Sequence, residues 1–467
     1  MIFTSLRNMV GERDLVHLNR LKCFNDAVFA IVATILILPI RRLLVTANTD
    51  LKAELEDGWI RLVVYFFAFL VICAVWESHV HRFMILSHID DILIWLNLAS
   101  LLFTSFLPFA CALEGKYPNR FFPILMICTN MATLEVLEVI MILYSFRQVH
   151  LLTEDLQELT EGQIKERRDY MLAKKILNSL LYVLAASMSN VNAISAWVLI
   201  SIVIVTPCIH RFIGHIFRKC KAIRMPGADF DLLFGNYIDT ERVECFSDGV
   251  FSIVATLLVL DITTESFPRE ADVEKDGLGA TVRDLRPSFL AYMATFIEIA
   301  FLWFVHHSLF HCIRRMNQIM LVANNISLAF VGYFPFSVAV FNKYVDHPKN
   351  LTSDTRLAVQ FASVAIFSAS LAQTVVFIVA LWKGSSHLGP RVNPSISRSS
   401  HLYLALKLII IPLTSLFIYF TTFARFLTIY ISFLTAAFMT PFLFLVLKIV
   451  FGHREVGELM RHDLEIL

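Results

Sequence analysis

The chain has 467 residues, of which 57% are hydrophobic and 17% are charged, and its formal net charge is +1. Soluble domains are about 45–50% apolar and about 25% charged, so this composition excludes an ordinary soluble protein. Apolar runs of about 20 residues recur along the chain, which is the length that crosses a bilayer. We therefore expect an all-α polytopic protein of the lipid bilayer, since lipid forces the backbone to satisfy its own hydrogen bonds. No basic block resembles a nucleic-acid patch, so we expect no nucleic-acid partner.

The apolar runs predict twelve spans, in two groups of six. The first six lie near 22–40, 59–77, 90–113, 121–146, 176–191 and 193–213. The second six lie near 244–262, 288–307, 317–341, 357–382, 403–423 and 426–450. Between spans five and six, residues 187–192 must form a tight turn, and a single long, tilted helix is the alternative.

These spans divide the chain into five parts. They are a cytosolic N-terminus (1–21), a first six-helix repeat (22–215), a cytosolic linker (216–241), a second six-helix repeat (242–450) and a cytosolic C-terminus (451–467). Residues 153–175 predict a separate amphipathic cytosolic helix, and 266–286 predict a charged luminal loop. Residues 1–22 lack the apolar core of a cleaved signal peptide, so the first span itself is expected to target the membrane.

The two halves are repeats of one sequence. The stretch 20–40 matches the stretch 242–262 at 13 positions. In spans two and three, five landmarks recur in a single register: Trp76/Trp303, His79/His306, Asn97/Asn324, Pro108/Pro335 and Phe109/Phe336. Because six is an even number of spans, both halves enter the bilayer from the same side and form a parallel repeat.

The first helix of each repeat carries a narrow stripe at helical spacing. The stripes are Ala27, Ile31, Thr34, Leu38 and Gly249, Ile253, Thr256, Leu260. One interpretation is a seam that packs helices together. The other is a pore wall, in which isoleucine closes a narrow pore by dewetting and threonine offers hydroxyls to a cation. Four such helices are needed to surround a pore, so this interpretation requires a homodimer.

Each of these helices begins with a carboxylate, Asp26 or Asp248. A carboxylate there costs a few kcal/mol unless it is paired or wet. The residues expected to share a polar network with them are Arg20, Asn25, Trp76, His79 and Asn97 in the first repeat, and Arg242, Ser247, Trp303, His306 and Asn324 in the second. The network either clamps three helices together or contacts the ion directly, and both roles are compatible.

Three further acids, Glu135, Glu138 and Glu298, lie inside apolar spans without counterparts in the other repeat. Pairing with a partner or regulation is the expected role, since a symmetric pore would need matched residues. No histidine or cysteine has tight metal-ligand spacing, so we expect no metal and no cofactor. The sequence lacks a TVGYG filter, a P-loop and hydrolase motifs, so we expect a protein that is not an enzyme.

Lys and Arg predict the orientation. With the N-terminus in the cytosol, 26 of the 40 Lys and Arg residues lie on the cytosolic side, as the positive-inside rule requires. The one plausible glycosylation sequon, at Asn350, then lies on the opposite side of the membrane. Residues 229–233 fit a short acidic dileucine sorting pattern, which is easily met by chance.

The motif that opens each repeat resembles a known family signature. It reads Arg242-x-x-x-Phe246-Ser247-Asp248 in the second repeat and Arg20-x-x-x-Phe24-Asn25-Asp26 in the first. This pattern resembles the signature of the transmembrane protein 175 family, and the resemblance covers nearly the whole chain. It implies a potassium-permeable channel of endosomes and lysosomes, with a central pore lined by the first helix of each repeat in a homodimer.

The resemblance also implies roles for single residues. Ile31 and Ile253 fall on the isoleucine constriction, Thr34 and Thr256 on the selectivity threonines, and Leu38 and Leu260 on a second narrow point. Animal two-repeat members are described as proton-permeable, with the motif aspartate implicated, which falls on Asp26 or Asp248. Two departures are Asn25 in place of the motif serine and Asp261 in place of Pro39.

The function expected from these observations is a potassium-permeable channel that also passes protons. The alternatives are a proton-coupled secondary transporter that uses Asp26 and Asp248, and a non-conducting membrane scaffold. The pore helices lack a Gly or Pro break near the midplane, which disfavours the transporter. Luminal pH, lipid, voltage and a cytosolic regulatory protein such as a kinase all stay open as gating stimuli.

Overall fold

The chain is helical throughout the part that the structure describes. The computed structural model describes residues 18–40, 50–118, 120–203, 206, 238–260, 262–263, 267–344, 353–384, 387–389, 392, 398–424 and 438–451. Within these ranges, nine helices are long and apolar enough to cross a membrane, and Ala193–Val203 and Phe438–Phe451 are shorter apolar helices. Together with α11 (Thr240–Leu257), they correspond one for one to the twelve expected spans.

The chain folds as two compact units. The first contains Met1–Leu36 and Ile60–Ile238, and the second contains Ile37–Trp59 and Asp239–Leu467. The boundaries therefore fall near the end of the first span and inside α4 (Leu51–Phe83). Each unit contains one of the two copies of the opening motif.

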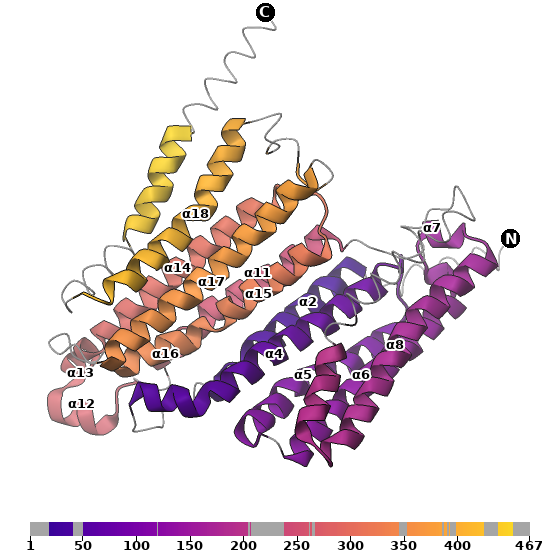
Figure 1. Ribbon diagram of the computed structural model, residues 1–467, viewed down its shortest axis with the longest axis horizontal. Helices are drawn as coiled ribbons and strands as arrows, with labels where there is room; N and C mark the ends of the chain where they lie inside the picture. The colour runs from indigo at the N-terminus through magenta and orange to yellow at the C-terminus, as the bar shows by residue number, and fades with distance from the viewer. Residues whose placement is uncertain are drawn as a thin grey trace, which may run out of the picture. The chain divides into compact units, whose positions relative to one another are not determined.

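The helices of the first unit run side by side (Figure 1). After α2 (Leu18–Ile35) and α4 come α5 (Asp91–Lys116), α6 (Phe121–Arg147), η1 (Val149–Leu151), α7 (Glu154–Gln157) and α8 (Glu161–Ser189). α2 packs on α5, and α6 packs on both α5 and α8. Polar caps fix two of the starts: Asp90 accepts from the Leu93 amide, and Thr160 and Gln163 form a capping box.

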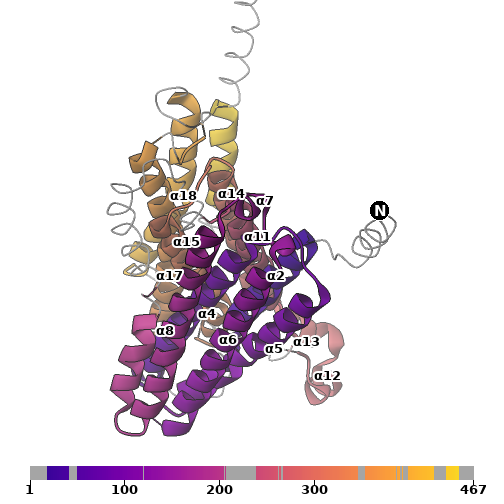
Figure 2. The same ribbon diagram turned by 90° about the vertical axis from the view of Figure 1, so that its right-hand side faces the viewer.

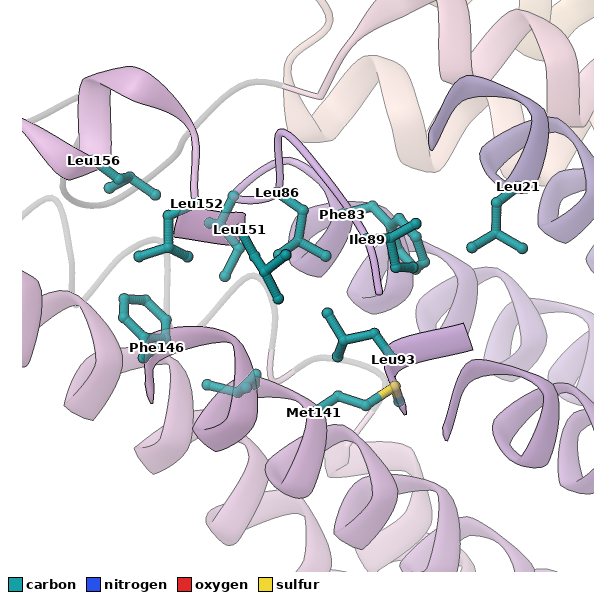
Figure 3. Close-up of a cluster of buried hydrophobic side chains, with 12 residues drawn as sticks. Leu21, Phe83, Leu86, Ile89, Leu93, Met141, Phe146, Leu151, Leu152 and Leu156 are labelled. Atoms are coloured by element: carbon teal, nitrogen blue, oxygen red, sulfur yellow. The ribbon is translucent and has the colours of Figure 1, made fainter. Parts of the chain in front are cut away.

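A buried apolar cluster holds one end of the first unit together (Figure 3). It gathers Phe83 from α4, Leu93 from α5, Met141 from α6, Leu151 from η1 and Leu156 from α7. Beside it, a single β-bridge pairs Leu86 with Leu152, and the Ser87 hydroxyl donates to the Leu152 carbonyl at 2.8 Å. The short segments that follow α4 and α6 are thus fixed to each other.

The fifth span differs from the prediction on one point and confirms it on another. The amphipathic stretch 153–175 is not a separate helix, because after the short α7 the chain enters α8 and continues without a break to Ser189. The tight turn after it is confirmed. Asn192 closes that turn with its amide bonded to the Met188 carbonyl, and its side chain accepts from the Ile194 amide at the start of the next helix. The alternative of one long, tilted helix is therefore wrong.

The second unit repeats the packing order of the first. Its long helices are α11, α14 (Arg286–Phe310), α15 (Gln318–Gly332), α16 (Phe334–Tyr344), α17 (Ser353–Lys383) and α18 (Arg398–Thr421). α11 packs on α15, α15 on α17 and α17 on α18, as α2 packs on α5, α5 on α6 and α6 on α8. The same contacts between corresponding helices confirm two homologous repeats of six helices.

The expected charged loop at 266–286 contains two short helices. They are α12 (Glu270–Asp276) and α13 (Leu278–Asp284), joined at Gly277 with φ +78°, a backbone conformation that favours glycine. Neither helix has a buried residue, and Figure 2 shows both set apart from the other helices of their unit. They add surface without adding to the core.

The β-bridge of the first unit has a counterpart in the second. Ile313 pairs with Leu388, and Ile313 is the equivalent of Leu86 in the register that aligns Trp303 with Trp76. The Arg314 amide also donates to the His387 carbonyl at 2.8 Å. Both repeats therefore tie the turn after their second helix to the segment after their fourth helix, a feature that the sequence did not predict.

Both opening helices also end at the same position of the repeat. α2 ends at Ile35 and α11 ends at Leu257, which are equivalent when Arg20 is aligned with Arg242, and in each case a short turn follows before helix resumes. Neither turn contains Gly or Pro, so the sequence predicted an unbroken helix. The hydroxyls of Thr34 and Thr256, one position before each end, donate to carbonyls of the preceding turn.

Candidate functional site

The carboxylate at the entrance of α2 is bound to the second helix of its repeat. The Trp76 indole Nε1 donates to Oδ1 of Asp26 at 2.8 Å. The neighbouring Asn25 and Asn97 amides bond to each other, with Asn97 Nδ2 at 2.9 Å from Asn25 Oδ1. Four of the residues predicted to share a network are thus brought together, and they join α2 to α4 and α5.

The second repeat builds the same arrangement with one substitution. The Trp303 indole donates to Asp248 Oδ1 at 2.7 Å, and Asn324 Nδ2 donates to the Ser247 hydroxyl at 3.1 Å. His306 Nε2 lies 3.0 Å from Asn324 Oδ1. Asn25 therefore replaces the motif serine without loss of the bond to the third helix, because its longer amide reaches the same partner position.

Aromatic rings pack around both histidines in the same way. His79 lies against Phe29 and Phe83, with ring centroids 5.2 and 4.7 Å away. His306 lies against the equivalent Phe251 and Phe310, at 5.4 and 4.1 Å. The opening helix is thus fixed to the second helix by an aromatic contact as well as by the Trp–Asp bond.

The burial of the two sites differs. Asp26 is 1% exposed, whereas Asp248 is exposed. The motif arginines differ in the opposite sense: Arg20 is exposed and Arg242 is 6% exposed. A buried carboxylate depends more on its hydrogen-bond donor than an exposed one does, since water cannot replace the donor.

The first repeat contains a buried charge cluster. The sequence predicted its two glutamates but not the arginine and the lysine that pair with them. Arg82 bonds to Glu138, and its Nη2 also lies 2.8 Å from His79 Nδ1 and 3.4 Å from Asn97 Oδ1. Lys175 lies 3.1 Å from Glu135 and 3.6 Å from Glu138. The expected pairing of the two glutamates is confirmed. Through Arg82 the charges also join the hydrogen bonds of Asp26, Trp76, Asn25 and Asn97, which together form the entrance network.

The second repeat also has a buried lysine on its fifth helix, but it lacks the acids. Lys407 on α18 donates to the Ser308 hydroxyl at 2.6 Å, as Lys175 on α8 donates to Ser78 at 2.5 Å. Its ammonium lies 3.4 Å from the Phe304 ring centroid, and no described carboxylate lies within ion-pair distance. Leu309 occupies the repeat position of Arg82. A lysine–serine contact of the same kind is therefore set in a charged environment in one repeat and in an aromatic one in the other.

The described residues hold no group of three or more His, Cys, Asp or Glu side chains that could bind a metal ion. Two predicted features lie outside the described residues: the sequon at Asn350 and the dileucine pattern at 229–233. Asp261, which replaces Pro39, also lies outside them.

Comparison with known proteins decides the family. The model of the family described as "Endosomal/lysosomal potassium channel TMEM175" matches residues 20–108 and 242–335. The "Endosomal/lysosomal proton channel TMEM175" of Danio rerio is 32% identical over 414 residues, which cover 86% of this chain and 78% of that protein. The chain belongs to the TMEM175 family.

A second curated relative agrees with this assignment. The Homo sapiens "Endosomal/lysosomal proton channel TMEM175" is 30% identical over 86% of this chain and 80% of its own length. A crystal structure titled as a lysosomal potassium-selective channel TMEM175 homolog, from Chamaesiphon minutus, is 26% identical and covers 43% of this chain and 95% of its own, with a TM-score of 0.35. The family is one of channels, so the protein is a multi-pass membrane protein and not an enzyme.

The TMEM175 model matches begin at Arg20 and Arg242, the first residues of the two opening motifs. The stripes that follow are not equally exposed in the single chain. Ile31 is 42% exposed and Thr256 is exposed, while Ile253, Leu38 and Leu260 are half-buried. Thr34 is fully buried, with its hydroxyl donated to its own helix.

Proposed function

We propose that the protein is a potassium-permeable cation channel of endosomal and lysosomal membranes that also passes protons. Its pore is lined by α2 and α11, and two copies of the chain supply the four helices that surround it. The observation that carries the proposal is the doubled Trp–Asp contact: Trp76 with Asp26 and Trp303 with Asp248 brace the same helix in each repeat. The names of the relatives, proton channels in animals and potassium channels in bacteria, support the choice of ions.

The proposed constriction is formed by Ile31 and Ile253, with Leu38 and Leu260 as a second narrow point. A ring of such side chains closes a narrow pore by excluding water, and so needs no selectivity filter of carbonyls. Ile31 lies on an exposed apolar face of α2 together with Phe24 and Ile35, and this supports the role, because such a face is free to line a pore or to pack on another helix. Thr34 and Thr256 are proposed to contribute to cation selectivity.

We propose that both termini are cytosolic. The excess of Lys and Arg on that side supports this orientation, and the sequon at Asn350 then lies in the lumen. Digestion of the expressed protein with an endoglycosidase checks it: wild type should lose mass, and Asn350→Gln should start at the lower mass. A glycan on a site engineered into the C-terminal 451–467 would overturn the orientation.

Recording from patched organelles, or from the plasma membrane of cells that overexpress the protein, tests the pore. Wild-type currents should reverse near the potassium equilibrium potential. The double variant Ile31→Ala, Ile253→Ala should show a larger single-channel conductance or a reversal potential shifted toward that of sodium, since a wider constriction stays wet.

Val32→Ala with Val254→Ala is the matched control. These valines lie one position further along each helix and are buried at 3% and 0% exposure, so they test packing rather than the pore. Their conductance and reversal potential should equal those of wild type. Wild-type-like currents in the isoleucine double variant would contradict the pore assignment, and slow saturable flux of fixed stoichiometry would indicate a transporter instead.

A further inference from the structure

A small cavity inside the second repeat lies away from the opening helices. It is lined by residues of α14, α16 and α17 and has a volume of about 50 Å³. Glu298 is 9% exposed and lines it, and its Oε2 has no hydrogen-bond partner among the described residues. A buried, unpaired carboxylate costs several kcal/mol in lipid, so an ion or a proton must neutralise it.

Two hydroxyls line the same cavity. The Ser337 Oγ is buried and has no described hydrogen-bond partner. The Thr295 hydroxyl donates to the Ala291 carbonyl at 2.8 Å, which leaves its lone pairs free to accept a cation or a water. Glu298 is the one titratable residue among the side chains that line the cavity from all three helices. The cavity therefore presents oxygen ligands around a single negative charge.

The first repeat shows that these three polar residues belong together. In the register set by the Trp, His, Asn and Pro landmarks, the equivalents of Thr295, Glu298 and Ser337 are Ala68, Val71 and Ala110. All three positions are apolar in one repeat and polar in the other. The cavity is also made roomier, since Ala291 and Ala294 replace Val64 and Phe67. Space and polarity thus differ between the repeats at the same place.

The size and the ligands restrict what the cavity can hold. A volume of about 50 Å³ accepts one small ion with about one or two waters, and it excludes an organic ligand. One carboxylate with hydroxyl oxygens suits a monovalent hard cation, while Mg²⁺ and Ca²⁺ use six or more oxygens and usually more than one carboxylate.

We propose that this cavity is a binding site for one alkali-metal cation, Na⁺ or K⁺, held by Glu298, Ser337 and Thr295 outside the pore. A proton on Glu298 competes with the cation, because either one neutralises the carboxylate. None of the three residues belongs to α2 or α11, so the site is distinct from the proposed conduction path. The first repeat has apolar residues at the three equivalent positions, so the site belongs to the second repeat.

Thermal unfolding of the full-length protein in detergent tests the proposal, with NaCl, KCl or choline chloride at equal ionic strength. Choline is too large for the cavity and gives the reference. Bound cation stabilises the folded state, so raising Na⁺ or K⁺ far above its dissociation constant should raise the wild-type Tm by about 3 °C over choline. The rise should shrink at acid pH, where the proton displaces the cation.

Three variants separate this site from cation binding in the pore. Glu298→Gln and Ser337→Ala should lose most of the cation-dependent rise in Tm. Ala110→Ser, which places a hydroxyl at the equivalent position of the first repeat, should keep it. A full rise in both Glu298→Gln and Ser337→Ala would overturn the proposal. So would a wild-type Tm that is the same in all three salts, which would mean that Glu298 simply remains protonated.

Discussion

The indole of Trp76 donates its hydrogen bond to an aspartate, Asp26, that is almost wholly withdrawn from solvent. The equivalent bond in the second repeat, from Trp303, reaches an aspartate that solvent also reaches. The two bonds have nearly equal lengths, but only the aspartate of the second repeat is exposed and can be hydrogen-bonded by water when the indole is removed. Their removal should show which repeat depends more on the entrance network.

Trp76→Phe should destabilise the protein more than Trp303→Phe. Loss of a donor to a buried carboxylate removes about 1–3 kcal/mol, whereas water can take the place of the donor at the exposed one. Thermal unfolding of the two purified variants measures the difference, and both keep an aromatic ring at the site. Equal losses of Tm would contradict the unequal burial of the two aspartates.

The buried pair of Arg82 and Glu138 gives a second test. Arg82→Met should lower the free energy of unfolding by about 3–5 kcal/mol, because Glu138 then keeps only more distant neighbours, Lys175 at 3.6 Å and His79 at 3.9 Å. The double variant Arg82→Met, Glu138→Met should recover much of that loss, since it leaves no uncompensated charge at this position. Denaturation midpoints of the two single variants and the double variant form the complete cycle. A double variant as unstable as the sum of the singles would show that the two residues act independently.

Lys175 on α8 and Lys407 on α18 should differ in how much stability is lost when each is replaced by Met. Lys175→Met leaves two glutamates near each other without their shared cation, and should destabilise by about 3–5 kcal/mol. Lys407→Met removes only a serine contact and a cation–π contact and replaces a buried ammonium by an apolar side chain, so its effect should stay within about 1 kcal/mol. Tm measured side by side checks the contrast, and a larger loss for Lys407→Met would refute it.

The link between the turn after α14 and the segment after α17 should weaken in acid. Burial, with help from Lys383 and Arg315, lowers the pKa of His387, whose backbone carbonyl accepts from the Arg314 amide. The unfolded state then binds the proton more readily, so stability is full above a pH of about 6.5 and falls as the pH drops below that value. Hydrogen exchange at the Arg314 amide, corrected for the intrinsic rate, should show falling protection.

His387→Gln is the control for that measurement. Glutamine keeps a polar side chain of similar size without a titratable group, so protection at Arg314 should become insensitive to pH. If the variant keeps the wild-type pH dependence, another group is responsible.

The recurring landmarks made much of the entrance site predictable. Trp76, Asn97 and their partners keep one register in both repeats, and an apolar helix leaves few ways to satisfy a tryptophan N–H and an aspartate together. The contacts of Asn25 with Asn97 and of Ser247 with Asn324 are those expected from the motif.

Arg82 escaped prediction because it has no counterpart in the second repeat and follows the expected end of its span near residue 77. The structure continues α4 to Phe83, so Arg82 lies inside the helix and is buried. Its position three residues after His79, on the same face of a helix, was a usable signal. The sequence did not predict the ends of α2 and α11 for another reason: the turns that follow them contain no Gly or Pro, so the local sequence favours continuing the helix.

The two repeats of one chain differ in their buried polar groups, and this has a consequence for how each repeat can evolve. In a ring of four identical subunits, any polar pocket or buried ion pair would appear four times, at equal depth. Here, among the residues that the structure describes, the cavity at Glu298 and the cluster at Arg82 each occur in one repeat. A substitution in either one changes a single repeat and leaves the equivalent positions of the other repeat as they are, so the two copies of one ancestral fold can diverge independently.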